Sequence, residues 1–277
     1  SSVCNASALL ALSPICSAWF MFWYSRMNTR YENISNCEKH LTHPQFALLN
    51  AVVHSIRIDT VQTPGEEMTA LKTQKLQWLV AALSVAVAGY ALVAYSLVPL
   101  GNLVHPQMKV TFEAHRVAIY VHIFCSVLAM GLGPWQFFSG LRARQPALHR
   151  WSGRIYLLGG VLPGGVTGLY VAGFAFGGTF NQIGFAVLAV LWLATGYLAY
   201  RAIRRKDIAA HQQWMLRNFA LTFAAVTLRL YLGTFAAAGI AFETFYAWLG
   251  WLCWVPNLLF MEWRIRRKVQ THLLAAH

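Results

Sequence analysis

The chain has 277 residues and a formal net charge of +13, yet only 11% of its residues are charged, 57% are hydrophobic and the mean hydropathy is +0.47. Soluble domains usually carry about 25% charged residues, so this composition excludes an ordinary soluble protein. The basic residues stand in short loops between apolar segments, which predicts contact with a lipid bilayer and argues against nucleic acid as a partner.

Residues 1–67 differ in composition from the rest of the chain. A largely polar sequence surrounds one apolar run, 9–24, which is short for a membrane span and has no basic residues before it. The run is therefore an interfacial helix, a poor signal segment or a marginal span, and a standard signal peptide is not expected. Met68 opens a segment that resembles a natural start. We expect 1–67 to be a largely irregular appendix, either non-native or an upstream extension, and 68–277 to be the transmembrane domain.

Six later segments have the length and apolar composition of transmembrane helices, which need about 20 predominantly apolar residues. The third contains Pro163, and the fifth carries Arg217 and Arg229. The expected fold is all-α, a polytopic membrane protein with a six-helix transmembrane bundle. The predicted spans are 78–100, 115–138, 155–174, 182–200, 214–239 and 242–263.

Basic residues alternate between the loops that join these spans. The loops between spans two and three, between spans four and five, and after span six are strongly basic, whereas the remaining loops are nearly uncharged. The positive-inside rule therefore places both ends of the bundle in the cytoplasm. The basic loop residues are Arg142, Arg144, Arg150, Arg154, Arg201, Arg204, Arg205, Lys206, Arg264, Arg266, Arg267 and Lys268, with Lys72 and Lys75 before the first span.

Two charged residues within the spans are expected to pair. A rise of 1.5 Å per residue places Arg217 near the cytoplasmic end of the fifth helix and Glu262 at a similar depth on the sixth. Charges inside a membrane usually face the bundle interior and pair with one another. We therefore predict a structural ion pair that holds these two helices together.

Two histidines, His149 and His211, lie at the cytoplasmic starts of the third and fifth helices. One interpretation is that they are polar helix-end groups that anchor the bundle at the interface. The other is that they are axial ligands of a b-type haem, with Arg150 and Arg154 neutralising its propionates. No metal site other than such a haem iron is expected.

A second polar layer is predicted in the outer half of the bundle, where His122 and Arg229 reach comparable depths. Gln136 follows His122 by 14 residues, close to four helical turns, and so would share its helix face. The three side chains would form either a hydrogen-bond network that locks the bundle or a site for an anionic or quinone-like ligand. In that site Arg229 would be the charge partner and His122 the proton carrier.

Several short motifs occur from Tyr120 onward. They are Tyr120-Val-His122, Gly133-Pro-Trp-Gln136-Phe, Leu148-His149-Arg150-Trp-Ser-Gly153-Arg154-Ile-Tyr156, His211-Gln-Gln-Trp214-Met215-Leu-Arg217, Leu228-Arg229-Leu and Trp254-Val-Pro256-Asn257-Leu. Together they resemble the family of predicted membrane proteins called domain of unknown function 2306, over roughly 68–267. The resemblance implies a multi-pass protein of the bacterial cytoplasmic (inner) membrane and supplies no activity.

Three functions follow from these observations, and the sequence leaves open whether the protein is an enzyme. We favour a redox membrane protein that binds haem or quinone at an intramembrane site lined by His and Arg. The first alternative is a non-catalytic subunit of a membrane complex, or an assembly factor, in which the polar layers are structural. The second is a small-solute transporter that uses His122 and Arg229.

Overall fold

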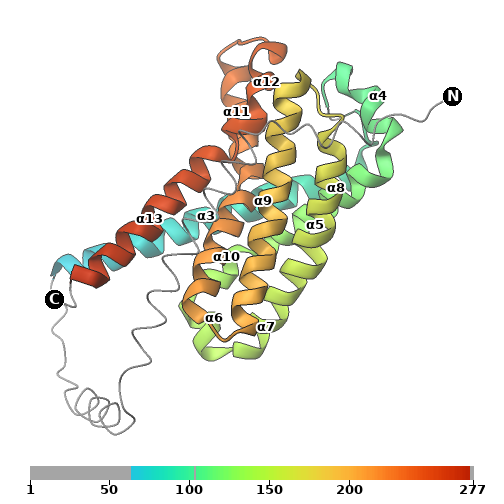
Figure 1. Ribbon diagram of the computed structural model, residues 1–277. Coiled ribbons are helices and arrows are strands. Elements are labelled where there is room, and N and C mark those ends of the chain that lie inside the picture. The colour runs from blue at the N-terminus through green and yellow to red at the C-terminus, as the bar shows by residue number, and fades with distance from the viewer. Residues whose placement is uncertain (1–63, 103, 275–277) are drawn as a thin grey trace, which may run out of the picture. The chain divides into compact units, whose positions relative to one another are not determined.

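The computed structural model describes residues 64–102 and 104–274, and within these ranges every regular element is helical (Figure 1). The chain divides into two compact units, Ser1–Glu66 and Glu67–His277. The predicted appendix lies outside the described residues except for its last few, and its apolar run 9–24 lies wholly outside them. The first described helix, α3 (Pro64–Leu97), already includes Met68.

The four helices α5, α8, α9 and α10 run side by side in Figure 1, with α6 and α7 at one end and α4, α11 and α12 at the other. α9 packs against α8, α10 and α12, and α5 packs against α8. The elements after α3 are α4 (Pro106–Ala114), α5 (Arg116–Leu132), η3 (Pro134–Phe137), α6 (Ser139–Arg144), α7 (Pro146–Arg154), a π-helical stretch η4 (Ile155–Val161), α8 (Leu162–Ala172), α9 (Gly178–Arg204), α10 (Ile208–Thr222), α11 (Ala224–Ala237), α12 (Phe242–Leu252) and α13 (Val255–Leu274).

Five helical segments within the described ranges are long and apolar enough to cross a membrane. The prediction of an all-α, multi-pass membrane protein is therefore confirmed, and these segments correspond to the first five predicted spans. They are Gln74–Leu97, Arg116–Phe137, Pro146–Ala172, Gly178–Arg204 and Ile208–Ala237.

The sixth predicted span, 242–263, is not one helix. α12 has only 11 residues, and Cys253 and Trp254 form a turn before α13 begins. Pro256 explains the interruption, because a proline has no backbone N–H to continue the hydrogen bonds of the preceding helix. The structure therefore does not confirm the six-span count.

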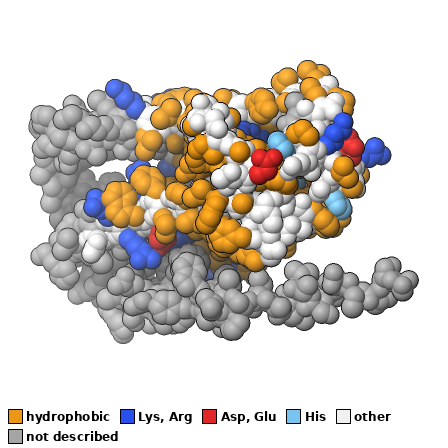
Figure 2. Space-filling model, turned by 90° about the horizontal axis from the view of Figure 1, so that it is seen from above, with side chains coloured by type: hydrophobic (Ala, Val, Ile, Leu, Met, Phe, Trp, Pro, Cys, Tyr) orange, Lys and Arg blue, Asp and Glu red, His pale blue; other side chains and the backbone are white. Residues whose placement is uncertain are grey.

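Apolar side chains cover much of the surface seen in Figure 2, with charged ones scattered among them. Examples on three different elements are Val93 on α3, Leu158 on η4 and Leu259 on α13, all of which are exposed. Soluble monomers rarely expose such extended apolar surface, whereas lipid solvates it well. The surface therefore agrees with the apolar spans.

Small residues allow α5 to approach η4 and α8 closely. A Cβ atom placed on Gly160 would lie 2.9 Å from the Cβ of Ala129, and one placed on Gly168 would lie 2.9 Å from the ring of His122. Real side chains do not tolerate such distances, so glycine is needed at both positions. This close packing brings His122 of α5 against the backbone of α8.

Two helix breaks lie side by side in the bundle, and one side chain forms hydrogen bonds to the backbone at both of them. α10 gives way to α11 at Phe223, and α12 gives way to α13 at Cys253. The amide nitrogen of Asn257 donates to the carbonyl oxygens of Ala220, at 3.4 Å, and Cys253, at 3.1 Å. Asn257 thus supplies donors to carbonyls at both breaks, which keeps the backbone satisfied where the helices are interrupted.

Candidate functional site

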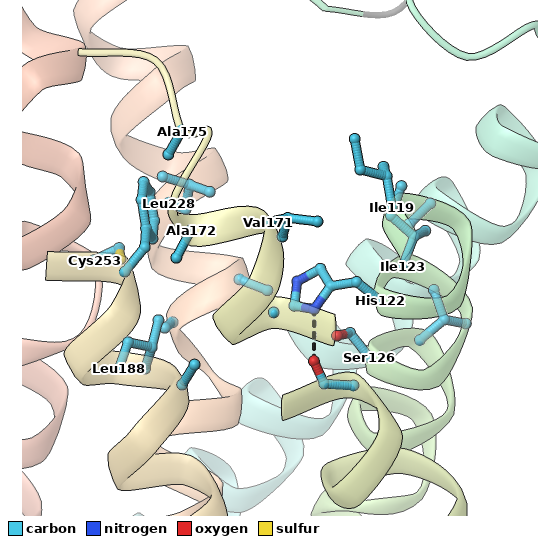
Figure 3. A pocket seen from close by; sticks show the side chains of 18 of the residues that line it. Ile119, His122, Ile123, Ser126, Val171, Ala172, Ala175, Leu188, Leu228 and Cys253 are labelled. Carbon is cyan, nitrogen blue, oxygen red and sulfur yellow. Dashed lines mark hydrogen bonds between the residues drawn. The ribbon is translucent and has the colours of Figure 1, made fainter. Parts of the chain in front are cut away.

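A cavity of about 310 Å³ lies among α3, α4, α5, α8, α9 and the junction of α10 with α11. Figure 3 shows apolar side chains from several of these helices pointing into it. Polar side chains are a minority in its wall, and they are Tyr95, Thr111, His115, His122, Ser126, Thr222, Arg229 and Tyr246. A concave, mostly apolar pocket with a few convergent polar groups is typical of a small-molecule site. Its apolar lining includes Ile119, Ile123, Val171, Ala172, Leu188 and Leu228.

His122 holds a fixed orientation in this wall. Its Nδ1 lies 2.8 Å from the carbonyl oxygen of Gly164, drawn as the dashed line in Figure 3. A carbonyl oxygen only accepts hydrogen bonds, so Nδ1 carries the proton and donates. In the neutral imidazole Nε2 is then an acceptor.

Arg229 places a cation in the same wall. Its Nη1 donates to the carbonyl oxygen of Ala225 at 3.0 Å, and the guanidinium carbon lies 6.0 Å from the ring centroid of Tyr90 on α3. Among the side chains that the structure describes between residues 74 and 267, no carboxylate comes within ion-pair distance of it. A guanidinium has five N–H donors, so Arg229 can donate to a ligand as well as to Ala225.

Gln136 lies away from this cavity, contrary to the expectation that it would join His122 and Arg229. It lies in η3, where its side-chain nitrogen donates to the hydroxyl of Ser152 at 2.8 Å. The backbone carbonyl oxygen of Gln136 accepts from Nη1 of Arg142 at 3.1 Å. The helix-face argument assumed an unbroken helix, but α5 ends at Leu132. Gln136 therefore belongs to the packing between η3 and α7.

Arg217 and Glu262 lie against each other, as their depths suggested. The Nη2 of Arg217 is 2.8 Å from Oε2 of Glu262, and both side chains are largely buried. The guanidinium also lies 4.8 Å from the ring centroid of Trp214. The contact joins α10 to α13 outside the cavity, and the structural role predicted for it stays a prediction.

The inner histidines lie on two elements at the end of the bundle formed by α6 and α7 (Figure 1). His149 is on α7, and His211 is near the start of α10. The Nδ1 of His211 donates to the carbonyl oxygen of Ala199 at 2.9 Å, whereas the buried Nδ1 of His149 has no hydrogen-bond partner in the described chain. The two arginines assigned to haem propionates, Arg150 and Arg154, are exposed. No group of three or more metal-binding side chains occurs in the described ranges, but two axial ligands suffice for haem, which stays a prediction.

A buried polar network beneath the cavity was not predicted. The Tyr156 hydroxyl donates to Oδ1 of Asn218 at 2.6 Å and lies 2.8 Å from the Thr222 hydroxyl, which also accepts from Nε1 of Trp192 at 2.8 Å. The Nδ2 of Asn218 donates to the Thr195 hydroxyl at 2.9 Å. Trp192 and Thr222 also line the cavity, so the network forms its floor. The one signal in the sequence was Asn218 and Thr222 four residues apart within an apolar span.

The comparisons with known proteins agree with this architecture. A family model described as "Predicted membrane protein (DUF2306)" matches residues 119–265, more than half of the 277 residues, so the chain belongs to this family. No curated protein and no solved structure matches the chain. The match includes His122 and Arg229 but not α3 or α4, which also line the cavity.

Proposed function

We propose that this member of the DUF2306 family is a quinone-associated membrane protein that binds a quinone-like molecule in the cavity around His122 and Arg229. One observation carries the proposal. A cation without a carboxylate partner among the described side chains and a histidine with a free ring nitrogen share the wall of a mostly apolar cavity. A quinone has matching chemistry, because its ring is apolar and its oxygens are polar.

Each part of the cavity has a role in this proposal. Arg229 donates to a ligand oxygen, and a hydrogen bond from a charged donor in an apolar setting is stronger than one between neutral groups. His122 exchanges a proton with the ligand, for which an imidazole is suited near neutral pH. The apolar side chains pack against the ring and keep water away from it.

The mostly apolar lining of the cavity makes a small polar solute an unfavourable ligand. Such a solute would lose its water in the cavity and find few hydrogen-bond partners there, which is energetically costly. A purely structural subunit is also less well supported, because its polar layers would be expected to satisfy one another. Arg229 and His122 instead make single hydrogen bonds to backbone carbonyls and face a cavity.

A b-type haem held by His149 and His211 is a second candidate for a redox cofactor. The observation that favours it is the hydrogen bond from Nδ1 of His211 to Ala199, which leaves Nε2 of His211 as the ligating atom. Histidines that bind metal commonly donate their other ring nitrogen to a carbonyl in this way. A haem here would supply electron transfer at the end of the bundle opposite α4 and α12.

We also propose a bacterial inner-membrane location with both ends of the bundle in the cytoplasm. The support is the clustering of basic residues in α6, in α7 and in the connection from α9 to α10, which lie at the same end of the bundle (Figure 1). Reporter fusions after Tyr200 and after Gly239 are expected to report opposite sides of the membrane. Identical sides would contradict this orientation.

The proposed function is tested by tryptophan fluorescence of the purified protein. Trp192 lines the cavity, so a short-tail benzoquinone is expected to quench fluorescence saturably. The Arg229→Gln variant should weaken this binding about tenfold or more, because a charged hydrogen bond is lost. The matched control is Arg204→Gln, an exposed arginine at the end of α9, which should bind like the wild type. Linear quenching that is equal in all three proteins would reject the site.

A further inference from the structure

We infer that the site around His122 binds the reduced form of its ligand, a hydroquinone, more tightly than the oxidised quinone. The inference rests on the proposed function and deepens it by naming the redox state that the site prefers. It follows from the direction of one hydrogen bond, that between His122 and Gly164.

The first step is that the ring of His122 has one favoured orientation. Its Nδ1 donates to the carbonyl oxygen of Gly164 at 2.8 Å. Turning the ring over would bring a carbon atom to this oxygen and lose the hydrogen bond. The ring also lies directly against Gly168, where even a Cβ atom would be 2.9 Å away. The hydrogen bond and the close packing thus both hold the ring of His122 with Nδ1 toward the carbonyl oxygen of Gly164.

The second step is that Nε2 of His122 presents a lone pair to the ligand. No residue in the described ranges forms a hydrogen bond with Nε2, and the ring points into the cavity (Figure 3). With Nδ1 protonated, the neutral ring offers only an acceptor on this side. A ligand that contacts Nε2 through a donor is therefore stabilised, and one that contacts it through an acceptor is not.

The two redox forms differ in this respect. Both oxygens of a quinone are acceptors only, so a quinone oxygen at Nε2 would place two lone pairs against each other. A hydroquinone has a hydroxyl at the same place, and that hydroxyl donates to Nε2. The other ring oxygen accepts from Arg229 in either form.

The remaining polar groups in the wall do not discriminate between the forms. The hydroxyl groups of Tyr95, Thr111, Ser126, Thr222 and Tyr246 can donate or accept. His115 also lines the wall, and its Nδ1 lies 3.1 Å from the Tyr170 hydroxyl, which can donate or accept, so this imidazole can take either tautomer and adapts to either form. Arg229 only donates, and it finds an acceptor oxygen on both. His122 is therefore the residue that determines the preference.

The expected preference is on the order of tenfold or more, because a matched hydrogen bond replaces an unsatisfied buried contact. Tighter binding of the reduced form raises the midpoint potential of the bound ligand. For a two-electron couple a tenfold preference corresponds to about 30 mV. The site would thus favour the uptake of electrons by its bound quinone.

Equilibrium dialysis under anaerobic conditions tests the preference with the full chain in detergent micelles. The probes are a short-tail benzoquinone, the corresponding hydroquinone and the dimethyl ether of that hydroquinone. We expect the hydroquinone to bind about tenfold more tightly than the quinone. The dimethyl ether, which has no hydroxyl to donate, should lose this advantage.

Two variants test whether His122 is the residue that causes the preference for the hydroquinone. The amide of a glutamine donates or accepts as required, so His122→Gln should bind both redox forms with similar affinity. His105→Gln replaces a histidine that is not part of the cavity wall and whose Nε2 lies 3.7 Å from Glu243, so this variant should keep the wild-type ratio. Equal or tighter binding of the quinone by the wild type would overturn the inference while leaving the proposed function intact. Failure of all probes to bind would overturn the proposed function itself, and the ligand series decides the matter even if His122→Gln does not fold.

Discussion

Arg217 and Glu262 join α10 to α13 through two hydrogen bonds to one oxygen, since Nε and Nη2 of the guanidinium lie 2.9 and 2.8 Å from Oε2 of the carboxylate. The other carboxylate oxygen accepts from Nε of Arg266 at 3.0 Å. The side chain of Arg217 is only 4% exposed and that of Glu262 only 15%. The pair is therefore a largely buried contact that fixes α13, a helix with a polar second half, to the apolar bundle.

Removing the carboxylate charge is expected to destabilise the protein. In Glu262→Gln, Arg217 remains buried without its counter-charge, which typically costs about 3–5 kcal/mol. The melting temperature should fall clearly in both detergent and lipid. The matched control is Glu113→Gln, whose exposed side chain forms only a surface pair with Lys109 at 3.9 Å. Equal melting temperatures for Glu262→Gln and the wild type would show that the pair contributes nothing.

A methyl group at the contact between α5 and η4 should also destabilise the bundle. In Gly160→Ala the new Cβ would lie 2.9 Å from the Cβ of Ala129 and 3.1 Å from its backbone, so the helices must separate. Overpacking of this kind typically costs about 1–3 kcal/mol. Gly131→Ala on α5 is the control, because nothing lies within 4 Å of its Cβ. Thermal denaturation of both variants measures the difference, and a loss as large in Gly131→Ala would point to a general effect of glycine replacement.

The network below the cavity predicts a cost for losing one hydroxyl group. Tyr156→Phe leaves Oδ1 of Asn218 without its 2.6 Å donor in a fully buried position. An unsatisfied buried acceptor costs about 1–3 kcal/mol. Unfolding in a denaturing detergent should show this loss for Tyr156→Phe but not for Tyr197→Phe, which removes the hydroxyl from an exposed tyrosine on α9. Identical unfolding curves would mean that water replaces the lost donor.

The haem candidate predicts a visible spectrum. Protein expressed with ample haem should show a Soret band that sharpens on reduction, and His149→Ala or His211→Ala should each abolish the low-spin spectrum. His122→Ala should leave it unchanged, because His122 lies in the separate cavity between α5 and α8. A colourless wild-type protein would remove the haem candidate and leave the quinone proposal standing.

Much of the fold could be predicted from the sequence because spanning helices need long apolar segments, and those segments are plain in the chain. The contact of Arg217 with Glu262 was also accessible, since helical rise alone sets the depth of each residue. Both results depend only on distance along a helix. They needed no knowledge of how the helices pack.

The misplacement of Gln136 and the broken sixth span have one physical reason in common. Gly133 and Pro134 follow the end of α5, and Pro256 follows the turn after α12. The sequence stays apolar through such positions although the helix ends there, so a hydropathy pattern does not reveal the break. The network around Tyr156 and Asn218 could not be foreseen, because its partners come from three separate elements that meet only in the folded bundle.

Photoaffinity labelling tests the central claim, that the cavity around His122 and Arg229 binds a quinone, most directly. An azidoquinone should on illumination label peptides of α5 and α8 that line the cavity, around Ile119, Ile123 and Val171, as mapped by mass spectrometry. Excess hydroquinone should suppress this labelling, and Arg229→Gln should reduce it while Arg204→Gln does not. Labelling confined to lipid-facing residues, unaffected by competitor or by Arg229→Gln, would contradict the account.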